Sequence, residues 1–462
     1  MSTQQPALEG MLTLAELDDA GIHTVIVATP DLQGRLVGRR VPAERFATVA
    51  EHGIEVCTCA WAWDIEQSFD LIGAGVLALC TMHNGAPDVR LRPDLATLRR
   101  AAWLDGIAVC LADPEHLHTG EPMSISPRVI LKKQIEALAR LGYTPHVGTE
   151  LEFYLFRNEP RALRQNGFRD LEPTTLTPSD FLIHEGNTYE PFFRKLRADL
   201  RASGIRMEAA QSEWGVGQWE MTFVYGLALE MADRHALYKL AVRDSAVAAG
   251  MSVTFMARPI TGQPGSSCHV HCSLTDASGT SAFWDSEAER GISPVMLAAI
   301  GGVLNHTPDL MAWYAPTVNS YRRINSEDVA GFGRTWGVEN RSVSARVVGH
   351  GPESLRFEFR LPGADTNPYL TLAGLIGSVA DGVSKQTAPP PMTVGNAYDS
   401  ATDSGMPSHL AEAAHLFGES AFVESLIGDE DRRHFRILAE FEWKSYQSTV
   451  SDWDMQRYFD RI

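Results

Sequence analysis

The sequence lacks both an excess of basic residues and a long apolar run. Lys and Arg number 40 against 58 Asp and Glu, which gives a formal charge of −18. A nucleic-acid-binding protein needs a basic surface, and this composition provides none, so we expect no nucleic-acid partner. No uncharged apolar stretch of about 18 residues occurs, so we expect no membrane-spanning helix.

Cysteine is also scarce, and the pattern Cys-x-x-Cys is absent. A chain of 462 residues does not need disulfide staples to fold, so we expect reduced thiols in a cytoplasmic protein. The first residues show no basic segment followed by an apolar run, so the sequence predicts no signal peptide. The six cysteines are Cys57, Cys59, Cys80, Cys110, Cys268 and Cys272.

What remains is the composition of an ordinary globular protein, with 44% hydrophobic and 21% charged residues. The length exceeds that of one simple domain. Residues 1–120 mix short strand-like runs with turns, which predicts a small α+β domain. A polar segment at residues 116–127 is the expected boundary, and residues 121–462 are expected to form a larger domain.

Helical periodicity begins at Pro127 and stops before Gly142, the usual placement of these two residues around a helix. This helix leads into a strand that contains Glu150. We expect further helices at residues 190–203, 229–249 and 366–384. Strand-like runs between and after these helices are expected at residues 215–224, 252–257, 268–274 and 355–361.

Glu150 and Glu152 are the most informative residues of the chain. They lie one residue apart in an apolar, aromatic run, Gly-Thr-Glu-Leu-Glu-Phe-Tyr-Leu-Phe, that reads as a buried strand. Side chains at positions i and i+2 of a strand share one face, so the two carboxylates project together. Buried like charges need compensation, and a divalent cation is the usual one for converging carboxylates.

Five later segments carry compatible chemistry, and the first two of them supply carboxylates and histidines. Glu213 and Glu220 flank glycines that let the backbone bend, and His269 and His271 share one face of an expected strand. Taken singly, an acidic pair on a strand more often faces solvent, and His-x-His is a weak metal signal. Metal-binding carboxylates and histidines together with anion-binding arginines are typical of enzymes that transfer phosphoryl groups. No Gly-x4-Gly-Lys-[Ser/Thr] is present, which excludes a P-loop enzyme.

Six motifs in a fixed order make the chain resemble glutamine synthetase and its glutamate–amine ligase relatives. The resemblance runs from about residue 31 to residue 458. It implies an α+β fold with a small N-terminal β-grasp domain and a large catalytic domain, a curved antiparallel sheet with helices. The motifs are Gly-x-Glu-x-Glu-Phe at 148–153, Glu-x6-Glu at 213–220, His-x-His-x-Ser-Leu at 269–274, Asn-Ser-Tyr-x-Arg at 319–323, Asn-Arg-Ser at 340–342 and Arg-x-Glu-x-Arg-x-Pro-Gly at 356–363.

The resemblance also implies a reaction. ATP would phosphorylate the γ-carboxylate of glutamate, and an amine would then displace phosphate, at a site that holds at least two Mg²⁺ or Mn²⁺ ions. The family forms rings of subunits, so a homo-oligomer, by family a dodecamer, is expected. In such rings a neighbouring subunit contributes an aspartate to the amine site, and Asp64 occupies roughly that position, although a plain turn residue is an equal alternative.

The resemblance assigns roles residue by residue. One metal would be held by Glu152, Glu213 and Glu220, and the second by Glu150, His269 and Glu358. Glutamate would be bound by Gly265, Arg323 and Arg360. ATP would be contacted by Glu208, Tyr225, His271, Ser273, Arg341, Arg346 and Arg356, and the catalytic residues would be Arg341, Arg346, Asp64 and Arg323.

Three departures from the family pattern bear on the substrate. Val329 stands where ammonia-using members carry a flap glutamate that helps to deprotonate ammonium, so we expect an organic amine, ethanolamine before polyamines. Pro264 replaces an asparagine that contacts glutamate. Tyr398 resembles an adenylylated tyrosine of some members, but a structural tyrosine is the favoured interpretation.

An ammonia-using enzyme and a catalytically inactive scaffold or sensor remain as alternatives.

Overall fold

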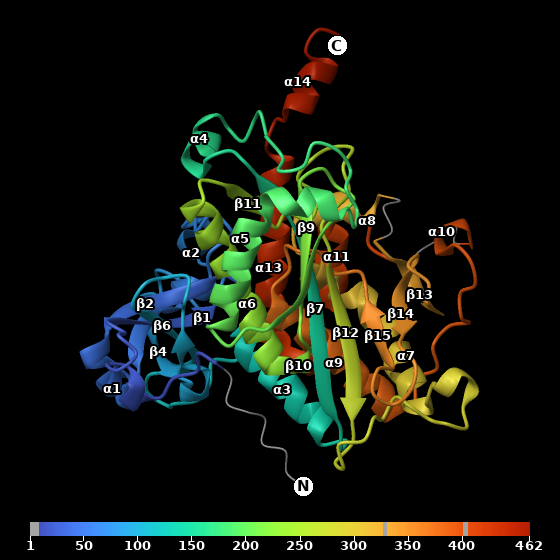
Figure 1. The fold of residues 1–462 in the computed structure, drawn as a ribbon, viewed down its shortest axis with the longest axis horizontal. Helices are drawn as coiled ribbons and strands as arrows, with labels where there is room; N and C mark the ends of the chain where they lie inside the picture. Colours follow the sequence, from blue (N-terminus) through green and yellow to red (C-terminus); the bar gives the residue numbers. More distant parts are fainter. Residues whose placement is uncertain (1–8, 327–329, 401–404) are drawn as a thin grey trace.

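The computed structural model describes residues 9–326, 330–400 and 405–462, and contains two β-sheets that are flanked by helices (Figure 1). The smaller sheet lies in the first quarter of the chain, and its strand order is β2-β1-β6-β4-β3, with β5 paired to β6. Strands β1 and β6 run parallel to each other. The strands are β1 Thr24–Pro30, β2 Leu36–Pro42, β3 Ile54–Cys57, β4 Asp88–Pro93, β5 Arg99–Arg100 and β6 Ile107–His116.

The larger sheet has the order β13-β14-β15-β12-β7-β9-β8, with β10 and β11 paired to β7. Nearly all of its neighbouring strands are antiparallel, and β13–β14 is the parallel pair. The strands are β7 Thr144–Phe156, β8 Met207–Ser212, β9 Gln218–Phe223, β10 Gly226–Leu227, β11 Ser252–Thr254, β12 Cys268–Thr275, β13 Phe332–Val338, β14 Val343–Val348 and β15 Arg356–Phe359.

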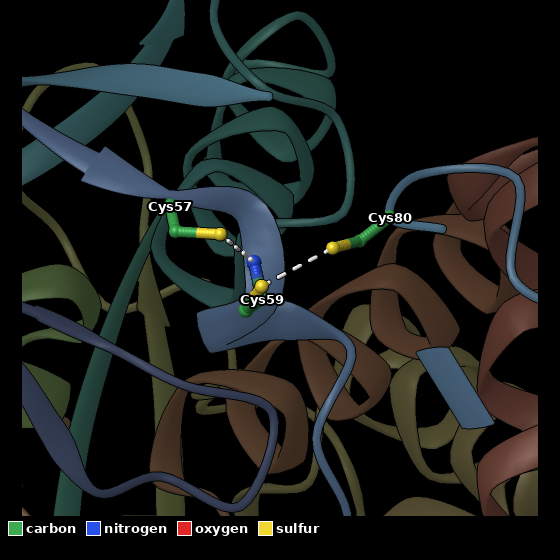
Figure 2. Close-up of side chains that lie close together, drawn as sticks. All are labelled: Cys57, Cys59 and Cys80. Carbon is green, nitrogen blue, oxygen red and sulfur yellow. Dashed lines mark hydrogen bonds between the residues drawn. The ribbon is translucent and has the colours of Figure 1, made fainter. Parts of the chain in front are cut away.

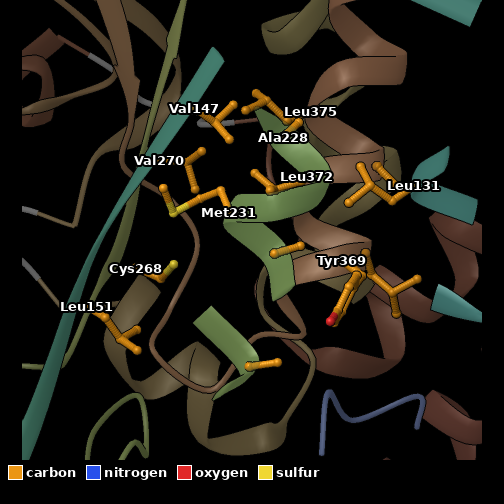
Figure 3. Close-up of a cluster of buried hydrophobic side chains, with 14 of the residues drawn as sticks. Leu131, Val147, Leu151, Ala228, Met231, Cys268, Val270, Tyr369, Leu372 and Leu375 are labelled. Carbon is orange, nitrogen blue, oxygen red and sulfur yellow. The ribbon is translucent and has the colours of Figure 1, made fainter. Parts of the chain in front are cut away.

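One face of this sheet forms the core because the strands place mainly apolar side chains on it. Val147 and Leu151 of β7 and Cys268 and Val270 of β12 point toward helix α6, which separates the sheet from helix α9 (Figure 3). Every second residue of β7 therefore contributes to the core, and the residues between them are left on the opposite face. That opposite face carries Glu150 and Glu152.

The helices cover the sheets and extend beyond the expected ones. Those longer than one turn and a half are α1 Ala43–His52, α3 Pro127–Ala139, α4 Pro160–Gln165, α5 Ile183–Arg201, α6 Ala228–Ala248, α7 Pro294–Tyr314, α8 Val318–Ile324, α9 Pro368–Lys385, α11 Leu410–Glu419, α12 Ala421–Ile427, α13 Asp429–Gln447 and α14 Asp452–Tyr458. No helix within the described parts of the chain combines the length and the apolar character that a membrane crossing requires.

The helix expected at residues 190–203 begins earlier, at Ile183, and has Pro191 in its interior. The residues before Pro191 are polar or exposed, so their periodicity gives no helical signal. Helices α7 and α13 were not anticipated. The strand expected at 215–224 begins only at Gln218, because residues 213–217 form the turn that connects β8 to β9.

Helix α13 contacts the part of the chain that bears the smaller sheet through His434. Its imidazole Nε2 lies 2.8 Å from the carbonyl oxygen of Trp61, and both side chains are buried. Burial lowers the pKa of His434 to about 4, although this hydrogen bond alone would raise the pKa. The ring therefore stays neutral in the folded protein at pH values where an unfolded histidine is charged.

This buried histidine predicts a loss of stability in mild acid. The unfolded state binds a proton below pH 6.5 and the folded state only near pH 4, so the contribution of His434 is complete above 6.5 and is lost as the pH falls toward 4. The difference corresponds to about 3 kcal/mol. Denaturant midpoints measured from pH 4 to 7.5 should depend less on pH in His434→Gln than in the wild type. His52→Gln, on an exposed side chain, should leave the dependence unchanged.

Candidate active site

Six acidic and histidine side chains converge on the polar face of the larger sheet because four neighbouring strands bring them into register. Glu152 of β7 pairs directly with Glu220 of β9, and Glu150 pairs with His269 of β12. On the other side of β12, His271 pairs with Glu358 of β15. The four strands are far apart in the sequence, so the sheet brings their side chains together.

Two groups of possible ligand atoms share Glu150. The ligand atoms of Glu150, Glu220 and His269 lie within 4.8 Å of one another, and so do those of Glu150, His271 and Glu358. His269 Nδ1 is 3.4 Å from Glu150 Oε2 and 3.5 Å from Glu358 Oε1, so the three residues expected at the second metal lie together. Burial alone would raise the pKa of Glu150, but its hydrogen bonds with both histidines lower it below the ordinary value.

Of the three residues expected at the first metal, Glu152 pairs directly with Glu220 across β7 and β9, and Glu220 and Glu213 share one glutamine. The amide of Gln211 donates to Glu213 and to Glu220, at 3.1 Å in each case. Burial, and then the charge of Glu152, raises the pKa of Glu213 to about 8. Burial, and then the charges of Glu150 and Glu152, raises that of Glu220 to about 10. The protein alone therefore does not balance the negative charge at this point.

A divalent cation fits this donor set. Five carboxylates and an imidazole are the oxygen and nitrogen ligands that Mg²⁺ and Mn²⁺ accept. A cation between them would favour the ionised forms of Glu213 and Glu220, whose pKa values are raised without one. His269 Nδ1 is the ring nitrogen that faces Glu150 and Glu358, so it is placed to bind a cation together with them.

Arginines line the same face beside Glu358. Arg346 of β14 donates to Glu358 Oε2 at 3.0 Å, and Arg360 donates to Glu358 Oε1. Arg356 Nε donates to His271 Nδ1 at 3.0 Å, which leaves the other ring nitrogen of His271 toward Glu150, at 2.8 Å. Arg356 therefore fixes the orientation of the His271 ring.

The residues expected to bind glutamate meet at the end of β12. Gly265 is required there because a Cβ at this position would lie 2.6 Å from Arg323 Cγ and 2.7 Å from the carbonyl oxygen of Ala257. Arg323 is buried, and its guanidinium donates to Ser267 Oγ and to the carbonyl oxygens of Leu361 and Arg360. Arg323 is thus rigidly held, and Arg360 connects this corner to the carboxylate cluster.

The residues expected at ATP are spread more widely along the sheet. Arg341 is exposed in the turn before β14, and Glu208 is exposed on β8. Tyr225, with 66% of its surface exposed, lies against Gly148 and His146. Ser273 is half-buried on β12, two residues beyond His271.

Asp64 lies elsewhere within the chain. Its carboxylate accepts hydrogen bonds from the backbone N–H and the hydroxyl of Ser68, at 2.7 and 3.0 Å. It lines a cavity of about 970 Å³ with Arg243 and Glu442, and no expected metal ligand is among the described residues that line it. Val329 lies outside the described residues.

Tyr398 of helix α10, Ala397–Ser400, is half-buried, and its hydroxyl oxygen is buried. Burial raises the pKa of its phenol, which Arg323 and Arg360 oppose. A covered hydroxyl suits a structural tyrosine better than a site of modification. Pro264, which lacks the expected amide, has its carbonyl oxygen bound by the hydroxyl of Tyr154 at 2.7 Å.

Comparison with known proteins agrees with this arrangement. Residues 124–458 match the model of the glutamine synthetase catalytic domain. The chain belongs to the glutamine synthetase family. The family and the α+β fold expected from the motifs are therefore confirmed.

Two relatives and a solved structure align with nearly the whole chain. A γ-glutamylethanolamide synthetase of Streptomyces coelicolor is 39% identical over 98% of this chain and 96% of its own length. A glutamate–isopropylamine ligase of Pseudomonas sp. is 33% identical over 96% of this chain and 97% of its own. A solved structure of GmaS with ADP superposes with a TM-score of 0.85 at 26% identity, over 97% of this chain and 100% of that one.

Sequence reasoning missed the neutral residues that hold the acidic ones. Gln218 Nε2 donates to Glu152 Oε2 at 2.9 Å, and the backbone N–H of Ser267 donates to the same oxygen at 2.8 Å. Gln218 shares the polar face with Glu220, which is a signal that alternation could have given. The role of Ser267 depends on a backbone contact, which no side-chain pattern reveals.

Proposed function

We propose that this protein joins the γ-carboxylate of L-glutamate to an organic amine, with ATP as the second substrate and γ-glutamyl phosphate as the intermediate. The observation that carries the proposal is the convergence of five carboxylates, two histidines and three arginines on one face of the larger sheet. Two relatives that align over nearly the whole chain have names that describe joining glutamate to an amine.

In this proposal Glu152, Glu213 and Glu220 hold one Mg²⁺ or Mn²⁺ ion, and Glu150, His269 and Glu358 hold another. Such ions stabilise the charge that develops on a transferring phosphoryl group. Arg341 and Arg346 neutralise further charge on that group. Because a carboxylate is a poor acyl donor, phosphorylation supplies the leaving group that the amine displaces.

Glutamate is placed at the corner formed by Gly265, Arg323 and Arg360. Arg323 is held by three acceptors of the protein, so it supports the pocket wall as well as adding positive charge. We propose further that residues 1–120 and 121–462 form separate domains. Asp64 of one subunit would reach the amine site of its neighbour in a ring, since within its own chain it lines a different cavity.

The amine is proposed from Val329. A valine neither accepts a proton nor pairs with ammonium, whereas a compact anionic pocket is needed to bind and deprotonate that ion. An apolar side chain in place of the glutamate leaves space in the amine site for the carbon atoms of an organic amine. The loss of a carboxylate also disfavours polyamines, which keep positive charges beyond the reacting nitrogen. Ethanolamine is therefore the first choice and polyamines are the second.

An assay of ATP-dependent phosphate release with glutamate and a panel of amines tests this choice. Ethanolamine is expected to exceed ammonium in kcat/KM by at least about tenfold, since one methylene group held in an apolar pocket is worth about that much. Val329→Glu should shift the ratio toward ammonium, whereas Val394→Glu, on a loop residue that is 86% exposed, should not. A wild-type preference for ammonium over every organic amine would instead identify an ammonia-using glutamine synthetase.

A further inference from the structure

Three cysteines meet in the first quarter of the chain, away from the acidic cluster. Cys57 ends β3, Cys59 lies in the short helix Thr58–Trp61 that follows, and Cys80 comes from a loop that returns beside them (Figure 2). The three sulfur atoms lie within 4.8 Å of one another, and Cys59 Sγ is 3.3 Å from Cys80 Sγ. Three converging sulfurs drawn from two separate segments are the geometry of a thiolate metal site.

The surroundings of the cysteines point to a structural role. Between Ala62 and Pro87 the chain contains only one short helix, Asp70–Ala74, in the described structure. A small hydrophobic cluster holds this segment, and it is separate from the main core. A loop-rich segment with so little apolar burial is commonly stabilised by a disulfide or a metal ion. The buried members of the cluster are Cys59, Ala62, Leu71, Ile72, Leu77 and Cys80.

Burial decides between these two kinds of cross-link. Oxidation requires an accessible thiolate, but Cys59 is 8% exposed and Cys80 is fully buried. A metal ion brings the charge that compensates buried thiolates, so burial does not oppose its binding once the thiol protons have left. Cys57 is only half-buried, so solvent can supply the ligand that completes a tetrahedral set.

We propose that Cys57, Cys59 and Cys80 bind a zinc ion that cross-links this part of the protein. Binding converts three thiols and Zn²⁺ into a tris-thiolate complex and releases three protons to solvent, while a water molecule fills the fourth position. The backbone N–H of Cys59 already donates to Cys57 Sγ at 3.2 Å, which stabilises negative charge on that sulfur. The ion would join the end of β3 to the loop before Thr81.

Cobalt(II) distinguishes this site from the acidic cluster in the full-length, reduced, metal-free protein. Both sites take Co²⁺, but only thiolate ligands give an intense sulfur-to-cobalt charge-transfer band in the near ultraviolet. We expect this band to saturate with one equivalent bound to sulfur and to disappear on addition of Zn²⁺. The acidic cluster supplies only oxygen and nitrogen ligands and cannot produce it.

Three variants complete the test. Cys80→Ser should abolish the band, and Cys57→Ser, at a half-buried position that tolerates a hydroxyl, should weaken Zn²⁺ binding by at least about tenfold. Cys110→Ser is the matched control, because Cys110 is a buried cysteine beside the hydroxyl of Thr97 and far along the chain from the cluster. It should keep both the band and the rise in Tm that Zn²⁺ causes in the wild type.

Two results would overturn the proposal. One is a wild-type protein that shows no thiolate band with Co²⁺ and instead accumulates a Cys59–Cys80 disulfide in air. The other is that Cys57→Ser and Cys80→Ser still show the charge-transfer band and bind Co²⁺ with the affinity of the wild type. Neither result depends on the activity of the enzyme, so failure of this proposal leaves the proposed ligase function untouched.

Discussion

Glu358→Gln is expected to reduce glutamate-dependent phosphate release by well over about a hundredfold, the upper loss typical of residues that only support a metal ligand. Glu358 is 1% exposed and accepts hydrogen bonds from Arg346 and Arg360. Its carboxylate also lies 3.5 Å from His269 Nδ1. Glutamine keeps the shape of the side chain but removes the charge on which both the arginines and a bound cation depend.

Glu353→Gln is the matched control for this variant. Glu353 lies in the exposed turn just before β15, so the same chemical change there should leave phosphate release within about twofold of the wild type. In Glu358→Gln, Arg346 and Arg360 lose a buried charged partner. The folding of both variants is therefore checked by Tm and by size-exclusion chromatography. Full phosphate release in a folded Glu358→Gln protein would contradict the assignment of this residue to a metal.

The strands of the site could be predicted from the sequence because side chains alternate between polar and apolar along each of them. Alternation in β7, β12 and β15 puts acidic, histidine and arginine side chains on one face and apolar ones on the other, which the structure confirms for Glu150 and Leu151. The order of the motifs then identified the family. Alternation within a strand does not predict which strands are neighbours, because the strand order depends on packing between distant segments.

Contacts between distant segments account for most of what the sequence left unpredicted. The hydrogen bond from His434 to Trp61 joins residues 373 positions apart, and neither residue stands out in its own segment. The same holds for the three cysteines, whose spacing of one residue and twenty residues matches no familiar metal motif. Helix α13 carries a partly buried face only because α11 and the loops of the first quarter of the chain pack against it.

Arg128→Met is expected to destabilise the protein more than any other single change considered above. Arg128 is the second residue of helix α3 and is fully buried, yet it donates to three carboxylates. Asp94 and Asp113 come from the part of the chain that holds the smaller sheet, and Asp233 comes from α6. Asp233 also accepts a hydrogen bond from the hydroxyl of Tyr369 on α9 at 2.8 Å. One guanidinium thus links the part of the chain with the smaller sheet to the central helices α3, α6 and α9.

Methionine preserves much of the volume of Arg128 but leaves Asp233 buried without its cation. Removing one partner from a buried ionic network costs about 3–5 kcal/mol, because the remaining charge is neither solvated nor paired. In a chain of this length we expect Tm to fall by about 3–5 °C. Asp233→Asn in the Arg128→Met background should recover part of that loss by removing the stranded charge.

Arg436→Met is the control that shows whether the loss of stability depends on burial of the arginine or on its number of ion pairs. Arg436 also binds two carboxylates, Glu440 at 2.7 Å and Glu419 at 2.8 Å, but its side chain is 33% exposed. Solvent replaces those contacts when the arginine is removed, so its loss should cost under about 1 kcal/mol. Equal falls in Tm for the two variants would show that the Arg128 network contributes no more than a surface cluster. A much larger fall for Arg128→Met would instead identify it as a main polar link between the part of the chain with the smaller sheet and the central helices.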